Sequence, residues 1–283
     1  MGLFDRLRGL FGETEARPAA GHDDVDVDAG DPAGRGRTGV NEPGSGEKSG
    51  SHGSHWDTVV TDQDDVLQSI VDAVESGRPT GWSADDGTDV VAYRAGAAPV
   101  STLVVADADG EIWTGYPVAE GVRHEVDVES VQPWANGAEG QVTATLGGST
   151  VSLFLTNYGE LDQPISGVHR VELAALAYDL GPAEAETLTT DDGREFSTSG
   201  MAGFVPFDGG DVDDYIFQTT VESVETVAFG DVTLYRLRAP LFRDADGTEY
   251  DVSVYAAEHV CDGYVPTAGD DVEGVFWLQG RVS

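Results

Sequence analysis

After residue 80, hydrophobic and polar residues alternate with a period of two, the spacing of β-strands whose two faces have different surroundings. Segments of this type read DVVAYR, STLVVADA, EIWTGY, QVTATL and TVSLFLTN. Asp-Gly pairs, which favour tight hairpins, recur at 86–87, 109–110, 192–193, 208–209 and 246–247. The pattern predicts a mainly β protein from residue 81 onward.

One internal segment has a helical period instead. TDQDDVLQSIVDAVESGRP begins at Thr61, which is expected to be the N-cap, and Gly77 and Pro79 are expected to end the helix. Its predicted apolar face consists of Val66, Leu67, Ile70, Val71 and Val74. We expect residues 56–80 to pack on the β domain that follows.

The first twelve residues, MGLFDRLRGLFG, predict a short amphipathic helix. The apolar stripe consists of Leu3, Phe4, Leu7, Leu10 and Phe11. Arg6 and Arg8 flank this stripe, where their stems can lie on an apolar surface and their guanidinium groups in a headgroup layer. So short a helix needs a surface to form on. Three surfaces are open: a membrane, a groove in a partner protein, or the protein's own domain.

Residues 13–55 contain few large apolar groups and predict a disordered acidic linker. His52 and His55, in SHGSHW, have a spacing compatible with a metal ion. Within a disordered tract we interpret them as linker residues and expect no metal there.

A repeated unit divides the β region. VESV occurs at 128–131 and at 221–224, and each copy is followed by a strand, a hairpin, a second strand, a Pro-x-x-Gly loop and a final strand. The final segment of the first copy, VELAALAYDL, is rich in residues that favour helices, but its place in the repeat predicts a strand. We therefore expect two tandem small β-barrels, at 81–203 and 204–283.

The second unit resembles the oligonucleotide/oligosaccharide-binding (OB) fold, a small Greek-key barrel, in its strand order and in the loop GDDVEG before its last strand. The resemblance covers about residues 210–283, and an SH3-like barrel or an open sandwich would have a similar pattern. In OB folds the second and third strands provide the ligand-binding surface.

The closing strand is expected to seal the second barrel. Its predicted inward face consists of Val272, Gly274, Phe276, Leu278, Gly280 and Val282. Its predicted outward face consists of Glu273, Val275, Trp277, Gln279 and Arg281. Trp277 is thus expected to be exposed beside Arg281.

The large negative net charge indicates that the protein works in concentrated salt. The chain of 283 residues has 52 acidic residues, 15 basic residues of which one is a lysine, and a net charge of −37. In molar salt, where the Debye length falls to about 3 Å, such charges no longer repel one another strongly. We predict the cytoplasm of a salt-accumulating halophile, where net charge does not exclude nucleic-acid binding. One cysteine excludes an internal disulfide, and the sequence contains neither an 18-residue apolar run nor a secretory signal.

The segment VTLYRLRAPLFR, at 232–243, is free of acidic residues and is the best candidate for a binding face. Alternation points Arg236 and Arg238 outward, while Pro240 bends or ends the strand. With Phe242, Trp277 and Arg281 they would form a polyanion or single-strand site through charge and stacking. The alternative is that these arginines are paired with neighbouring carboxylates.

Catalytic signatures are missing from the sequence. His259 and Cys261 lack the second Cys or His pair of a structural zinc site, and the runs DADGE and DADGTE lack the further ligands of a calcium loop. We expect no catalytic residue, metal or cofactor, and interpret both runs as hairpin turns.

These patterns favour a non-enzymatic binding or scaffold protein, cytoplasmic or peripheral to the membrane, whose β-barrels are recruited to a membrane surface or protein partner by residues 1–12. A second hypothesis is a single-stranded nucleic-acid-binding protein. A third is an enzyme with a site between the barrels.

Overall fold

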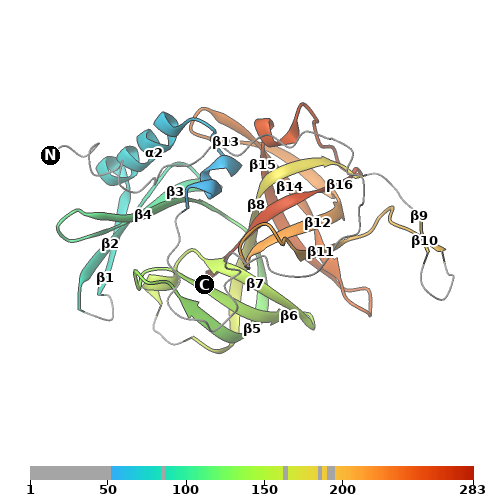
Figure 1. Cartoon of the computed structure of the whole chain (residues 1–283), viewed down its shortest axis with the longest axis horizontal. Helices are drawn as coiled ribbons and strands as arrows, with labels where there is room; N and C mark the ends of the chain where they lie inside the picture. Colours follow the sequence, from blue (N-terminus) through green and yellow to red (C-terminus); the bar gives the residue numbers. More distant parts are fainter. Residues whose placement is uncertain (1–51, 84–86, 162–164, 184–186, 190–194) are drawn as a thin grey trace, which may run out of the picture.

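The protein is described here by a computed structural model that covers residues 52–83, 87–161, 165–183, 187–189 and 195–283 (Figure 1). It is mainly β, with a four-stranded sheet, a ten-stranded sheet and a two-stranded sheet; the described residues contain one α-helix. The predicted amphipathic helix at 1–12 and the linker up to residue 51 lie outside the described residues.

The helix α2 (Gln63–Ser76) forms where the 3.6-residue spacing predicts it. Asp62 rather than Thr61 is its N-cap, and the Asp62 carboxylate accepts a hydrogen bond of 2.8 Å from the backbone N–H of Asp64. Gly77 ends the helix, where a Cβ atom would lie 2.2 Å from the carbonyl oxygen of Ala73. No helix within the described residues combines the length and apolar character needed to cross a membrane.

The four-stranded sheet is an antiparallel meander in chain order. Its strands are β1 (Arg78–Ser83), β2 (Asp89–Ala95), β3 (Val100–Asp107) and β4 (Ile112–Ala119). The apolar face of α2 packs on β2 and β3, and Figure 1 shows this helix-covered sheet at one end of the molecule. The internal helix thus packs on the strands that directly follow it, which form a sheet of their own.

Both D-x-D-G runs are hairpin turns, as predicted. The Asp107 carboxylate accepts a hydrogen bond from the backbone of Glu111 at 2.8 Å, and Gly110 has a φ of +79°. In the second run, the Asp244 carboxylate accepts hydrogen bonds of 2.9 Å from the backbones of Asp246 and Thr248. The aspartates thus close turns with their own chain.

The ten-stranded sheet contains most of the remaining chain. Its strands are β5 (Val122–Pro133), β6 (Gly140–Leu146), β7 (Ser149–Leu155), β8 (Gly167–Pro182), β11 (Gly203–Pro206), β12 (Asp214–Thr220), β13 (Ser223–Phe229), β14 (Val232–Arg243), β15 (Glu249–Ala257) and β16 (Asp271–Val282). Between β8 and β11, β9 (Thr187–Thr189) pairs with β10 (Glu195–Ser197) as a separate two-stranded sheet. The order in the large sheet is β11-β12-β16-β7-β6-β5-β8-β15-β14-β13.

Five of these strands close a barrel. β5, β6 and β7 form a meander, β8 pairs with β5, and β16 pairs with both β7 and β8. The closing contact between β16 and β7 is short, because it joins only Gln279 and Gly280 to Phe154 and Leu155. On either side of that contact the two strands diverge.

The remaining strands repeat this scheme around the same central pair. β14 follows β13 and pairs with it, β15 pairs with β14 and lies parallel to β8, and β12 pairs with β16. The second VESV, at 221–224, joins β12 to β13. The first, at 128–131, lies at the bulge where β5 passes from β8 to β6.

Two separate domains that divide near residue 203 would share few strand pairs, but the structure joins the two predicted units by a long one. β8 from the first predicted unit and β16 from the second are antiparallel neighbours over most of their length. In addition, β1–β4 form a sheet of their own instead of part of a barrel. The alternation predicted the strands correctly, but it contains no information on which strands pair across the two units.

VELAALAYDL lies in β8 and is a strand, as its position in the repeat predicts. Burial explains why its helix-favouring composition has no effect. Seven of its residues, namely Val171, Leu173, Ala174, Ala175, Leu176, Ala177 and Leu180, are fully buried. β8 pairs with three strands, β5, β15 and β16. Its small side chains allow other parts of the protein to cover both of its faces.

Two hydrophobic cores result. The barrel core contains side chains from the inner faces of the large sheet, among them Leu153, Leu173, Phe276 and Leu278. The interlayer core joins α2 and the four-stranded sheet to the outer face of the large sheet, where Phe154, Leu176 and Trp277 lie. The outer face of β16 is therefore an internal surface of the protein.

Candidate functional site

The described chain begins with a segment that is buried in the interlayer core. His52, His55 and Trp56 are all less than 7 % exposed, and the short 3-10 helix η1 (Ser54–Thr58) carries the last two. His52 Nδ1 lies 2.7 Å from His55 Nδ1, so one ring donates an N–H hydrogen bond to the other. The Trp56 indole donates to the carbonyl oxygen of Gly115 at 3.0 Å.

A buried carboxylate is the partner of this histidine pair. His52 Nε2 lies 2.5 Å from Glu139 Oε1, and both side chains are 1 % exposed. Thr114 Oγ1 donates to the same oxygen at 3.3 Å, and the Asn136 amide donates to the other. Glu139 thus has partners on both oxygens, which a buried carboxylate requires.

Aromatic rings enclose the two histidines. The His52 ring stacks on Trp134 with centroids 5.0 Å apart, and the His55 ring stacks on Trp277 at 3.9 Å. Tyr116 and Phe154 complete the enclosure around His52. The arrangement anchors the chain where it enters the folded body.

The interpretation of His52 and His55 as disordered linker residues is wrong. His52 and His55 belong to the folded body by their contacts, because their rings reach Glu139, Trp134 and Trp277, which lie far along the chain. The one available signal was the aromatic residue directly after them, Trp56, at the end of a tract that otherwise lacks large apolar groups.

The predicted exposure of Trp277 is also wrong. Trp277 is fully buried, and its indole donates to Asp213 Oδ2 at 3.1 Å. Next to it on the same face, Gln279 is hydrogen-bonded to the Pro117 carbonyl at 2.8 Å and to the Ala119 N–H at 3.1 Å. The outward face was inferred correctly, but the four-stranded sheet and η1 cover it.

The other members of the predicted Arg/aromatic face do not form one surface. Arg238 is exposed and pairs with Asp251 at 2.6 Å, and Arg236 lies 3.5 Å from Glu225 and over the ring of Tyr255. Arg281 is at the far end of β16, 3.5 Å from Glu160. Phe242 is buried. The alternative interpretation, carboxylate-paired arginines, therefore agrees with the geometry.

A β-bulge explains the burial of Phe242. The register between β14 and β15 shifts between Pro240 and Phe242, which turns Phe242 from the face of Arg236 and Arg238 to the inner face. Pro240 thus bends the strand without ending it, since β14 continues to Arg243.

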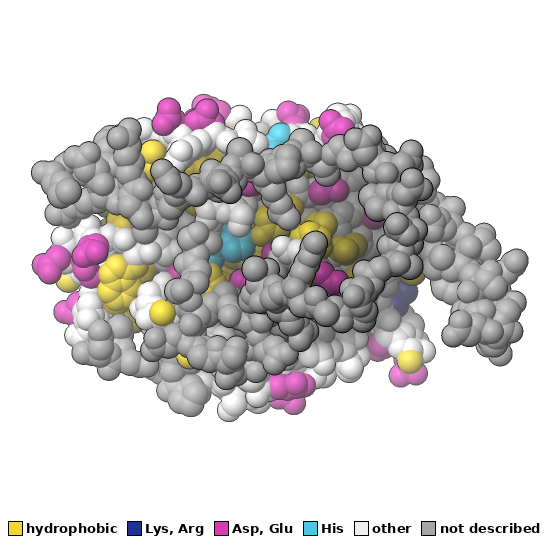
Figure 2. Space-filling view, in the orientation of Figure 1, with side chains coloured by type: hydrophobic (Ala, Val, Ile, Leu, Met, Phe, Trp, Pro, Cys, Tyr) yellow, Lys and Arg dark blue, Asp and Glu magenta, His cyan; other side chains and the backbone are white. Residues whose placement is uncertain are grey.

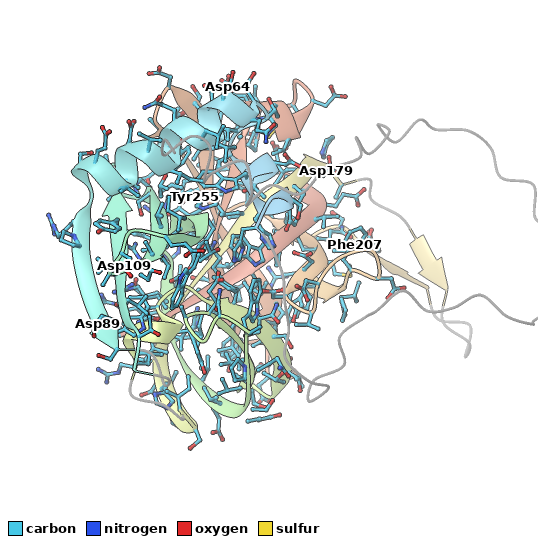
Figure 3. The ribbon with its side chains drawn as sticks, turned by 60° about the vertical axis from the view of Figure 1, so that its left-hand side comes forward. Asp64, Asp89, Asp109, Asp179, Phe207 and Tyr255 are labelled. Carbon is cyan, nitrogen blue, oxygen red and sulfur yellow. The ribbon has the colours of Figure 1, made fainter. Side chains whose placement is uncertain are left out.

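The described residues also contain a groove of about 710 Å³ where β7 diverges from β12. Three walls line it: the start of β7, strand β11, and the loop at 207–212. Its aromatic lining consists of Phe204, Phe207, Tyr215 and Phe242. Figure 3 labels Phe207, which lies on the opposite side of the molecule from Asp89 and Asp109 of the four-stranded sheet.

Hydrogen bonds hold the groove open. The Tyr215 hydroxyl donates to the Ser152 carbonyl at 3.0 Å and accepts from the Ser152 N–H at 2.7 Å, and burial raises the pKa of Tyr215 to about 12. In the loop, Asp214 accepts from the backbone N–H of Asp211 at 2.8 Å. Because backbone groups alternate along a strand, the N–H and C=O of Thr150 point to the same side as those of Ser152, into the groove.

Apolar side chains continue outside the groove on β11 and β12. Val205 is 56 % exposed and Ile216, its partner in the strand pair, is 44 % exposed. Strand β11 is the end strand of the sheet, so its other edge has no strand partner among the described residues. Figure 2 shows one face of the molecule, where Asp and Glu side chains lie at many points along the outline and hydrophobic side chains are visible in several places, including the middle.

One group of residues has the spacing of metal ligands within the described chain. Glu222, Glu249 and Asp251 lie together at the surface. Arg238 pairs with Glu222 and Asp251, and Arg243 pairs with Glu249, so these two arginines offset most of the negative charge of the group.

No protein-family model, curated protein or solved structure matches this chain. Its function therefore has to be argued from the groove and from the buried anchor.

Proposed function

We propose that this is a non-enzymatic binding protein of a halophile cytoplasm, which holds an extended, largely apolar protein segment in the groove between β7 and β11. In this proposal residues 1–12 recruit the folded body to a membrane surface or to a partner protein. The observation that carries it is the groove itself, 710 Å³ in volume and lined by four aromatic side chains.

The groove suits an extended peptide more than a small polar substrate. Aromatic rings supply apolar contact area, and the backbone N–H and C=O of Thr150, on the groove side of β7, could form strand-like hydrogen bonds with a peptide main chain. The exposed side chains of Val205 and Ile216 extend the apolar surface beyond the groove. No histidine, cysteine or lysine is among the lining residues, which disfavours the enzyme hypothesis for this groove.

The buried anchor supports the recruitment role. A tether of residues 13–51 would have a root-mean-square reach of about 35 Å if flexible. Because His52 is fixed in the interlayer core, a surface bound to residues 1–12 would hold the folded body, and the groove with it, by that tether.

We further propose that the closed barrel and its continuation arose by doubling of one small OB-like unit that shares β8 and β16. The equivalent positions of the two VESV segments and the matching strand pairs support this origin.

The groove is tested by site-specific photo-crosslinking in cells. A photo-reactive amino acid at Val205, beside the groove, should give discrete crosslinked products. Digestion with a protease should remove the attached mass, because the proposed occupant is a protein segment. Val168, which is 68 % exposed and lies on β8, is the matched control and should give none. Equal crosslinking at both positions would contradict the groove as a binding surface.

Recruitment is tested separately. Deleting residues 1–12 should release the protein from the membrane or partner fraction of cells lysed in high salt. The truncated protein should still give the Val205 crosslinks when it is mixed with the protein that occupies the groove. An unchanged distribution of the truncated protein would show that this segment does not recruit it.

Single-stranded nucleic-acid binding has narrower support, because only the Arg236 and Arg238 side chains of the predicted face reach the surface of β14. Replacing both by serine should weaken retention on single-stranded DNA in molar potassium chloride if this hypothesis is right. Unchanged retention rejects the face.

A further inference from the structure

Two arginines lie at one end of the interface between the layers. Arg94, on β2, is in register with Leu103 on β3 and Tyr116 on β4, on the face that meets the large sheet. Arg281 follows Gln279 on the outer face of β16, and Gln279 is bonded to Pro117, the residue next to Tyr116. The two layers therefore bring both guanidinium groups to the same region, within electrostatic range of each other.

Three buried donors in this region have no hydrogen-bond acceptor among the described residues. They are one terminal nitrogen of Arg94, one terminal nitrogen of Arg281, and the indole nitrogen of Trp82 on β1. The remaining contacts of the arginines are long: 3.5 Å from Arg94 to Ser101 Oγ, and 3.5 Å from Arg281 to Glu160. Buried donors without an acceptor are rare, because each loses its hydrogen bonds to water without replacing them.

The local structure holds these groups in place. The short 3-10 helix η2 (Tyr158–Glu160) lies beside Trp82, and a Cβ atom at Gly159 would be 2.5 Å from the Trp82 ring. Before η2, Asn157 bonds both the N–H and the C=O of Val282, at 3.1 and 3.0 Å, which fixes the end of β16 next to Arg281. The donors are thus pre-positioned by a close packing that only glycine permits.

Arg94 is paired less closely with carboxylates than several other arginines of the described chain are. Arginines elsewhere in the described chain, such as Arg123, Arg238 and Arg243, each have a carboxylate within 2.7 Å. Among the described residues, no carboxylate lies within ion-pair distance of Arg94, and burial and then the nearby Arg281 lower its pKa. Glu160 and the exposed Glu120 act on Arg94 only from a greater distance.

We propose that Arg94, Arg281 and Trp82 form a binding site for an oxyanion group, either a phosphate or a carboxylate. Guanidinium groups present planar pairs of N–H donors that match the oxygens of such groups, and an indole adds a single directed N–H. A bound oxyanion would supply the missing acceptors and separate two like charges. The Arg281 side chain is 38 % exposed, which leaves a path from solvent.

The experiment is isothermal titration calorimetry of the full chain with inorganic phosphate and, in a second arm, with acetate, in constant potassium chloride of about 2 M. We expect saturable binding in at least one arm. Binding of phosphate alone assigns the site to phosphoryl groups, and binding of acetate alone assigns it to carboxylates. No saturable heat in either arm overturns the proposal.

The variants locate the site. Arg94→Gln and Arg281→Gln should each weaken binding at least about tenfold, since each removes a charge-assisted donor. Trp82→Phe keeps the ring and removes only the indole N–H, so a loss of about fivefold is expected. Arg123→Gln, on the exposed face of β5, is the matched control and should bind as the natural protein does.

Folding is checked by near-ultraviolet circular dichroism for each variant. If Arg94→Gln does not fold, Arg281→Gln and Trp82→Phe still decide the question. Equal dissociation constants in Arg281→Gln, Trp82→Phe and Arg123→Gln would overturn the proposal.

Discussion

The two faces of β16 border two cores of different chemistry. On the barrel side, Val272, Phe276 and Leu278 are fully buried among other apolar side chains. On the layer side, Trp277 and Gln279 are buried just as completely, but each is hydrogen-bonded to a group on another element. Equal burial on one strand is thus achieved by apolar packing on one face and by specific polar pairing on the other.

The difference lies in which parts of the chain meet. The barrel core is filled by the alternating side chains of paired strands, so any apolar residue of suitable size fits the pattern. In the interlayer core, each polar side chain needs one particular partner distant in sequence, as with His52 and Glu139 or Trp277 and Asp213. The barrel core should therefore tolerate apolar exchange, whereas the interlayer core should be sensitive to the loss of single atoms.

The largest effect is expected from removing β16 altogether. Deletion of residues 271–283 takes away the neighbour of β7, β8 and β12 and opens both cores. Burial of its large side chains alone is worth about 10 kcal/mol, comparable to the whole stability of a typical domain. The truncated chain should lose cooperative thermal unfolding in circular dichroism. A retained sharp transition would show that the two cores do not depend on the strand.

A single cavity in the barrel core is the next test. Phe276→Ala should lower the free energy of unfolding by about 3–5 kcal/mol, because the fully buried ring leaves a cavity. Phe276→Leu should recover most of that loss, since it keeps much of the volume. Urea unfolding followed by fluorescence measures both variants. If leucine costs as much as alanine, the barrel core is less tolerant than proposed.

Loss of the buried carboxylate tests the interlayer core. Glu139→Ala should cost about 3 kcal/mol, because it leaves His52 and Asn136 without their acceptor. Glu172→Ala removes the partner of exposed Arg123 and should cost no more than about 1 kcal/mol in the same unfolding experiment. Similar values for the two variants would contradict the importance of the histidine pair as an anchor.

The most selective test changes one donor. Trp277→Phe retains most of the ring packing against His55 but removes the N–H that donates to Asp213. We expect a loss of about 1–3 kcal/mol in unfolding free energy, since the buried Asp213 carboxylate loses one of its hydrogen-bond donors. A loss below about 0.5 kcal/mol would show that Trp277 stabilises the fold by the packing of its ring and that its N–H contributes little.

The smallest effect is expected at the surface of β14. Arg238→Ser removes an ion pair of 2.6 Å to Asp251, but Arg238 is half-exposed and screened by solvent and salt. The unfolding free energy should change by no more than about 0.5 kcal/mol. A larger loss would mean that the paired arginines contribute to the fold.

Local pattern was sufficient for much of the fold. The hairpins at Asp107 and Asp244 follow from turn chemistry, and α2 follows from its apolar spacing. The repeat predicted β8 as a strand where composition favoured a helix. These features depend on neighbours in sequence or on a repeated order, both of which the sequence contains.

The candidate sites were not predictable in the same way. The groove arises where β7 and β12 separate, and the arginine site arises where two sheets meet, so neither has a motif. His52 and His55 lie at the end of an acidic tract whose composition predicts a linker, but in the structure both side chains are buried in the core. The bulge at Pro240 turned Phe242 inward although alternation placed it outward.

By itself, the sequence determined which residues alternate, where turns occur, that one helix follows residue 62, and that the chain is strongly acidic. The tertiary structure alone decided which sheet covers the outer face of β16, and with it the burial of Trp277 and the placing of Arg94 and Arg281 at one end of the interface between the layers. The reason is physical: alternation sorts side chains onto two faces of a strand, but a face becomes interior only when another part of the chain packs on it.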